Sequence, residues 1–199
     1  MEERQRTIGV LLFPGFELLD VFGPLEAFGV RTARGFFEPV LVGQNPGPVE
    51  SAQGPQAVAE IGLTDPRPPG TRKGVDNLLL TAWIAERSVA AELVMSVCTG
   101  AAMLARAGVL EGKRATTNKL SFHWVVGQGP NVQWVKEARW VEDGKFFTSS
   151  GVSAGIDMAL AVIEKLAGRE PAEQAAVQME YEWHREAGWD PFAKIHGLV

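Results

Sequence analysis

The stretch that decides the fold is ELVMSVCTGAAMLARAG, residues 92–108, because two kinds of pattern meet in it at Cys98. Residues 92–97 are a short apolar run, which is typical of a strand buried in a parallel sheet. Residues 99–107 carry small and helix-forming side chains and stop at Gly108, a residue type that often ends a helix. The sequence therefore predicts a strand that turns directly into a helix, with Cys98 at the junction.

The same alternation of strand and helix patterns extends over the rest of the chain. Asp143-Gly144 is a strong turn signal and predicts a hairpin within residues 132–149. Alternating strands and helices predict an α/β sandwich with a mainly parallel sheet. The expected strands are 7–13, 39–43, 92–97 and 114–117, and the expected helices are 16–30, 77–90, 99–107, 153–168 and 171–187.

One segment breaks this alternation. Residues 62–74, GLTDPRPPGTRKG, hold three prolines and almost no apolar side chain. Proline cannot donate a hydrogen bond to a neighbouring strand, so the segment cannot supply a strand to the interior of the sheet.

Length and composition set the class of protein. The 199 residues suffice for one domain, residues 1–199, with a sizeable core. Apolar residues make up 46% and charged residues 22%, which disfavours a disordered chain, a collagen-like chain or a disulfide scaffold. The formal charge is −5 and no basic run is longer than Arg72-Lys73, so we expect no nucleic-acid partner.

The single cysteine and the N-terminal segment bear on location. One cysteine cannot close an intramolecular disulfide, which favours a reducing, cytoplasmic location. The apolar stretch 10–13 is broken by Pro14-Gly15 before a signal-peptide core or a membrane span could form. We therefore expect no association with a membrane.

Cys98 has the position of a reactive group. Ligands of open parallel sheets bind at the carboxyl ends of the strands, where Cys98 is expected to lie. The first amides of the next helix would stabilise a thiolate and lower the thiol pKa below its reference of about 8.5. Small residues 99–102 would admit a substrate and leave amides for a developing anion. A lone cysteine is also commonly a small buried apolar residue, so position alone leaves both interpretations open.

Three blocks of sequence carry a family resemblance. They are VLLFPGFELLDVFGPLEAF at 10–28, SVCTGAAMLARAGVLEGKRATT at 96–117 and WVEDGKFFTSSGVSAGIDMALAVIEKLAG at 140–168. On these blocks the chain resembles the ThiJ/PfpI superfamily, which has a class I glutamine amidotransferase-like fold. Within it, the chain is similar to the branch of isonitrile hydratase and of the sensor half of certain transcription regulators. The resemblance implies a flavodoxin-like three-layer sandwich.

The resemblance also implies an activity and its residues. Cys98 would lie at the nucleophile elbow, the sharp turn from strand to helix that exposes a nucleophile. Asp20 would reach its sulfur as acid and base, and Thr99 would orient substrate or water. The reaction would be hydration of an isonitrile to an N-substituted formamide, which requires no metal or organic cofactor. From the residues alone, a helix-surface or capping aspartate is the more ordinary interpretation of Asp20.

The sequence departs from the family at two places. Family members usually carry a strand ending in Pro-Gly-Gly before the stretch that matches residues 70–77, and the proline-rich segment replaces it here. Either residues 57–61 take the place of that strand, or the chain is a shortened form. Members also commonly have histidine at Asn118, and asparagine cannot exchange a proton near neutral pH. His123 could substitute, although a packed or surface histidine is the more ordinary interpretation.

Two other patterns suggest rival chemistry. GVSAG at 151–155 matches the G-x-S-x-G pattern of serine hydrolases, with Ser153 followed by Asp190 and His196 in the right order. Serine and glycine at the start of a helix are also expected for capping alone. Glu180 and His184 would share one face of a helix, but two ligands without a third give weak support for a metal site.

The expected partners are a small-molecule substrate and a second copy of the chain. The apolar tail residues Trp183, Trp189, Phe192 and Ile195 are expected to cover the core, with a homodimer seam as the alternative. A ligand-binding or redox-sensing protein on the same fold stays the alternative to an enzyme, because both departures from the family pattern favour it.

Overall fold

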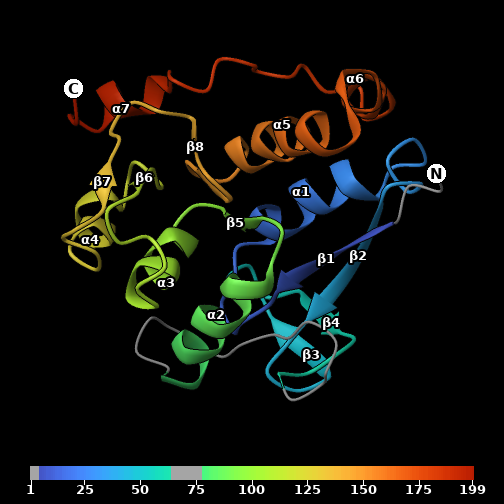
Figure 1. Cartoon of the computed structure of the whole chain (residues 1–199), viewed down its shortest axis with the longest axis horizontal. Coiled ribbons are helices and arrows are strands. Elements are labelled where there is room, and N and C mark those ends of the chain that lie inside the picture. The colour runs from blue at the N-terminus through green and yellow to red at the C-terminus, as the bar shows by residue number, and fades with distance from the viewer. Residues whose placement is uncertain (1–4, 64–77) are drawn as a thin grey trace. The chain divides into compact units, whose positions relative to one another are not determined.

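The computed structural model describes residues 5–63 and 78–199 (Figure 1). The chain divides into two compact units. The first unit holds residues 1–73 and 159–185, and the second holds residues 74–158 and 186–199. That residues 1–199 form a single domain stays a prediction.

The strands of the first unit begin with the pair predicted at 7–13 and 39–43. Strand β1 (Arg6–Leu11) lies beside β2 (Phe37–Val42) in parallel, as Figure 1 shows. Strands β3 (Gly47–Glu50) and β4 (Gln56–Ala59) form an antiparallel hairpin. Ile61 makes a parallel bridge to Val42, on the edge of β2 that β1 leaves open.

This pairing bears on the alternatives left by the sequence. Among the described residues, 57–61 pair with β3 and with the edge of β2 opposite β1. That they take the place of the family strand, or that the chain is a shortened form, stays a prediction. Residues 64–74 of the predicted gap at 62–74 lie outside the described residues.

Helices of the first unit pack on an apolar core. Helix α1 (Leu18–Gly29) follows β1, and α6 (Arg169–Gln178) follows Gly168, whose φ of 98° suits glycine at a helix boundary. Helix α5 (Ala154–Ala167) contributes residues to both units. The buried core of the unit includes Leu12, Phe16, Val21, Val49, Ala57 and Ala59.

The second unit is built around a three-stranded sheet in the order β5-β9-β8. Strand β5 (Val94–Ser96) pairs with β9 (Phe146–Ser149) in parallel, and β8 (Trp140–Asp143) pairs with β9 in the hairpin predicted at Asp143-Gly144. Strand β6 (Arg114–Ala115) pairs in parallel with β7 (Gln133–Trp134), so residues 132–149 hold a short strand before the hairpin.

Two helices of the second unit lie within the predicted ranges 77–90 and 99–107, namely α2 (Leu78–Ala90) and α3 (Gly100–Arg106). The unit also has two short helices, α4 (Phe122–Val126) and α7 (Pro191–Ile195). The α/β class is therefore confirmed, and three of the five strand pairs in the described residues are parallel. No helix in the described part of the chain is long and apolar enough to cross a membrane.

The structure corrects two predictions near the C-terminus. The helix expected at 171–187 ends at Gln178. The tail was expected to cover the core with its large side chains, but Trp189, Phe192 and Ile195 are 51%, 48% and 70% exposed. The buried apolar residues here are Ala193 in α7 and Leu198 beyond its end, and they pack against Phe122.

Candidate active site

Cys98 lies at the predicted junction, two residues after β5 ends and two before α3 begins. Its backbone has a φ of 54°, in the left-handed region that non-glycine residues rarely adopt. Such a conformation costs on the order of 1–3 kcal/mol and persists only where surrounding contacts enforce it. The backbone therefore makes the sharp turn expected of a nucleophile elbow, and the side chain is half-buried.

Two hydrogen bonds hold the backbone of Cys98. Its N–H donates to the carbonyl oxygen of Ser150 at 3.1 Å, just beyond the end of β9. Its carbonyl oxygen accepts from the Thr117 hydroxyl at 2.8 Å. Thr117 is fully buried, which shields the donor of this bond from water. Both backbone polar groups of the strained residue are thus satisfied by segments distant in the sequence.

The residues after Cys98 only partly match their expected roles. Ala101 and Ala102 are buried against Val125, so their small size serves helix packing as well as access. The amide of Gly100 donates to the Val97 carbonyl oxygen at 2.9 Å and is already engaged. Thr99 is the N-cap of α3, but its side chain makes no capping hydrogen bond. Its hydroxyl is therefore not used to start the helix.

Asn118 has a structural role beside this turn. Its Oδ1 accepts the Ser121 N–H at 2.9 Å, in the turn that leads into α4. Its Nδ2 packs over Gly151, where a Cβ atom would lie 2.4 Å from it. A side chain at Gly151 would therefore require the Asn118 amide to shift. His123, considered as a substitute for the family histidine, is exposed on α4.

The rival site residues have other partners in the structure. Arg139 Nη2 donates to the Ser153 hydroxyl at 3.4 Å. Asp190 caps α7 by accepting the Phe192 N–H at 3.1 Å, and His196 is exposed. Glu180 and His184 lie beyond the end of α6, and Glu180 has a φ of 49°. The helical spacing assumed for that pair is therefore wrong.

Asp20 belongs to the first unit, whereas Cys98 and Thr99 belong to the second. Asp20 lies in the first turn of α1, as predicted, with a half-buried side chain. Its Oδ1 atom is shielded from solvent.

Comparison with known proteins places the chain in a family. The model of the DJ-1/PfpI family matches residues 6–165. The chain belongs to the DJ-1/PfpI family. It is 34% identical over 190 residues to the isonitrile hydratase of Pseudomonas putida, covering 87% of this chain and 78% of that protein.

Solved structures of DJ-1/PfpI proteins have the same fold as this chain. A ThiJ/PfpI family protein from Pseudomonas syringae superposes with a TM-score of 0.79 at 29% identity, over 91% of this chain and 77% of that one. Drosophila melanogaster DJ-1beta gives 0.75 at 20% identity, over 90% of this chain and 100% of that one, which shows the fold alone. The predicted superfamily and its flavodoxin-like α/β fold are thus confirmed.

The burial of Lys119 in this DJ-1/PfpI protein was not predicted from the sequence. The Lys119 side chain is buried, with 3% of the residue exposed, one residue after Asn118. Its Nζ donates to Thr116 Oγ1 at 2.8 Å, to the Ala138 carbonyl oxygen at 2.6 Å and to the Thr117 carbonyl oxygen at 3.4 Å. Burial lowers the pKa of Lys119 from 10.5 to about 8, although the nearby Asp190 raises it. No pattern in the sequence distinguishes this lysine from a surface one.

The lowered pKa of Lys119 predicts a pH dependence of stability. Between about pH 8 and pH 10.5 the unfolded chain binds this proton more tightly than the folded one, so the free energy of unfolding should rise with pH. Measured against Lys119→Met, the free energy of unfolding of the wild type should rise by at most about 3 kcal/mol over this range. Below about pH 8 the difference between the two proteins should no longer change with pH. Urea unfolding of both proteins across this range measures it, with the exposed Lys136→Met as the control. A difference independent of pH would contradict the prediction.

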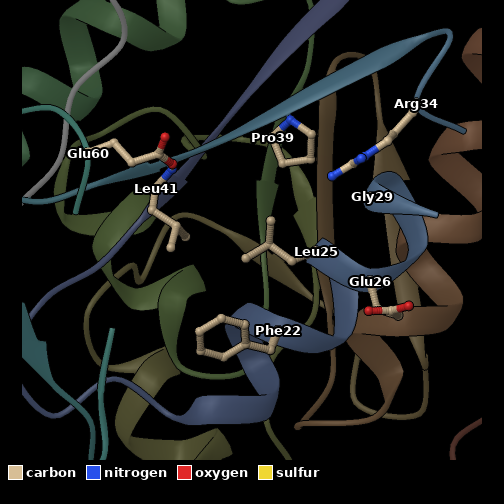
Figure 2. A pocket seen from close by; sticks show the side chains of 8 residues that line it. All are labelled: Phe22, Leu25, Glu26, Gly29, Arg34, Pro39, Leu41 and Glu60. Atoms are coloured by element: carbon tan, nitrogen blue, oxygen red, sulfur yellow. The ribbon is translucent and has the colours of Figure 1, made fainter. Parts of the chain in front are cut away.

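A separate pocket of about 360 Å³ lies within the first unit. Figure 2 shows its apolar side chains Phe22, Leu25, Pro39 and Leu41 together with Glu26, Arg34 and Glu60. Glu60 Oε1 accepts the Leu41 N–H at 2.9 Å, so one of the acids is already paired with the pocket wall. None of the predicted site residues lines this pocket.

Proposed function

We propose that this protein hydrates a small isonitrile to an N-substituted formamide, with Cys98 as nucleophile and Asp20 as acid and base. The observation that carries the proposal is the left-handed backbone of Cys98 at a strand-to-helix turn, held at both its N–H and its carbonyl oxygen. The 34% identity to an isonitrile hydratase supplies the reaction. The proposal requires the Asp20 carboxyl group to reach the Cys98 sulfur.

The chemistry needs one nucleophile and one proton carrier. The thiolate of Cys98 adds to the terminal carbon of the isonitrile while the Asp20 carboxyl group protonates that carbon, which gives a thioimidate. Water then adds across the carbon–nitrogen double bond with help from the Asp20 carboxylate. The carbon–sulfur bond breaks, the hydroxyl proton returns to Asp20, and the formamide leaves. Thr99 would orient the substrate or the water, and no cofactor takes part in these steps.

The proposal extends to assembly and location. We infer a homodimer, because Trp189, Phe192 and Ile195 present apolar surface on and beside α7. A cytoplasmic location fits a site that depends on the chain's one reduced cysteine.

A ligand-binding or redox-sensing protein is the second candidate. The observation that favours it is Asn118, which stands where the family commonly has histidine and whose amide is engaged in local packing. A half-buried cysteine held at such a turn can be oxidised without turning over a substrate.

The two candidates are separated by an assay with benzyl isocyanide as the probe. The proposed function predicts the formyl proton signal of the formamide in an NMR time course, deuterium on the formyl carbon in D₂O, and label from ¹⁸O-water in the carbonyl group. Wild-type protein that gives no formamide, but whose Cys98 is oxidised by peroxide, would favour the sensor.

Asp20→Asn is expected to lower kcat by about a hundredfold or more, because asparagine cannot donate or accept the transferred proton. The matched control is Glu26→Gln, a loss of an exposed carboxylate on the same helix, which should leave kcat unchanged. Formamide formation at saturating benzyl isocyanide measures both variants. Equal rates for the wild type and Asp20→Asn would remove Asp20 from the mechanism.

A further inference from the structure

We infer that Thr117 is a positioning residue that holds Cys98 in its left-handed conformation and thereby sets the reactivity of the thiol. The inference starts from the strain at Cys98, whose φ is 54°. The Thr117 hydroxyl donates to the Cys98 carbonyl oxygen at 2.8 Å. The direction of that oxygen depends on the backbone dihedrals of Cys98, so rotation out of the left-handed region would break this bond.

The Thr117 hydroxyl is itself held on a fixed platform. The N–H of the preceding residue, Thr116, donates to Thr148 Oγ1 at 2.8 Å, which ties the segment to β9. The Thr116 hydroxyl donates to the Val135 carbonyl oxygen at 2.7 Å, and Lys119 Nζ bonds both Thr116 Oγ1 and the Thr117 carbonyl oxygen. Thr116 and Thr117 are both fully buried. A β-branched side chain has few rotamers, so the Thr117 hydroxyl stays directed at the Cys98 carbonyl oxygen.

Strand β9 contacts both the segment that holds Thr117 and the strand that leads into Cys98. Strand β9 pairs with β5, the strand that leads into Cys98, and it carries Thr148. The contacts thus run from β5 to β9, from Thr148 on β9 to Thr116, and from Thr117 back to Cys98. Loss of the Thr117 hydroxyl should leave these strands paired but free the Cys98 carbonyl, so that the sulfur samples other directions.

The matched test uses two adjacent buried threonines. Thr117→Val removes the hydroxyl that bonds Cys98 at nearly constant volume, and Thr117→Ser keeps it. Thr116→Val is the control, because it removes a buried hydroxyl that bonds Val135 and accepts from Lys119, with no bond to Cys98. Cys98 is the one cysteine of the chain, so alkylation by iodoacetamide reports on it alone.

The inference predicts a selective effect on reactivity. Thr117→Val should lower the rate constant of Cys98 alkylation by about tenfold and move the midpoint of its pH profile upward. Thr117→Ser should retain the wild-type profile. Thr116→Val should lower the melting temperature but change the profile much less than Thr117→Val does, because the Thr116 N–H still donates to Thr148 and the Thr117 hydroxyl still donates to Cys98. An unchanged profile in Thr117→Val, or an equal change in Thr116→Val, would overturn the inference. If Thr117→Val does not fold, Thr117→Ala compared with Thr117→Ser gives the same contrast.

Turnover is the second readout, and it rests on the proposed function. Thr117→Val should lower kcat for benzyl isocyanide about tenfold with little change in KM, because only the direction of the attacking sulfur changes. Wild-type protein without turnover, but with alkylation sensitive to Thr117, would refute the proposed function and support the inference. Wild-type turnover that Thr117→Val leaves intact would support the function and refute the inference.

Discussion

Cys98→Ala should lower isonitrile turnover by at least about a thousandfold, because the reaction then has no nucleophile to form the thioimidate. Alanine keeps the Cβ atom and the backbone hydrogen bonds to Ser150 and Thr117, so the fold should persist. Formamide formation by NMR measures the loss, and the circular dichroism spectrum checks the fold. Mass spectrometry of wild-type protein quenched during turnover should find the adduct on Cys98. Residual turnover within tenfold of wild type would exclude Cys98 as the nucleophile.

Cys98→Gly serves as the partner variant for this prediction. Both substitutions remove the sulfur, so both should be equally inactive. Glycine adopts a φ of 54° without the steric penalty that alanine meets there. The free energy of unfolding of Cys98→Gly should therefore be about 1 kcal/mol higher than that of Cys98→Ala. In an ordinary helix or strand position the order is the reverse. A more stable alanine variant would mean that the left-handed backbone of Cys98 is relaxed in solution.

The position of Cys98 could be predicted because the signals for it are local. An apolar run, a cysteine, small residues and Gly108 follow one another within 17 residues, from 92 to 108. Gly108 indeed has a φ of 76° and ends α3 with a bond from the Val109 N–H to the Leu104 carbonyl oxygen. The hydrogen bonds that hold Cys98 could not be predicted in the same way. Thr117 and Ser150 lie on other segments, and only the fold brings them to it.

The end of α6 shows the opposite case. The predicted helix runs to residue 187, since no glycine or proline stands between 172 and 187. The structure instead ends the helix with Glu180 at a φ of 49°, with bonds from Glu180 N–H to the Val177 carbonyl oxygen and from Tyr181 N–H to the Ala176 carbonyl oxygen. These bonds make a Schellman motif, which usually has glycine at the left-handed position. With glutamate there, the sequence carries no stop signal.

Asp157→Asn should destabilise the protein by about 3 kcal/mol or more, the largest stability effect that we expect. Asp157 Oδ2 lies 2.6 Å from Arg139 Nε and 2.5 Å from Nη2, and the two side chains are 0% and 10% exposed. Removing the carboxylate leaves the guanidinium buried without its counter-charge. Urea unfolding measures the loss, with Glu173→Gln in the exposed pair with Arg169 as the control that should show no measurable change.

A double variant separates an unpaired charge from lost packing. Replacing both partners, as Arg139→Met with Asp157→Leu, removes the buried charges together, so it should be less destabilising than Asp157→Asn alone. If the double variant is the less stable one, the ion pair itself contributes and the argument from desolvation fails.

The same ion pair bears on the reactivity of Cys98. The Ser150 N–H donates to the Arg139 carbonyl oxygen at 2.8 Å, and the Ser150 carbonyl oxygen accepts the Cys98 N–H at 3.1 Å. Arg139 is thus linked to the N–H of the strained residue through two hydrogen bonds, whereas Thr117 bonds its carbonyl oxygen. Asp157→Asn should therefore slow alkylation of Cys98 even at temperatures where the variant is fully folded, whereas Glu173→Gln should not. Because one contact fixes the N–H of Cys98 and the other its carbonyl oxygen, combining Asp157→Asn with Thr117→Val should slow alkylation more than either change does alone.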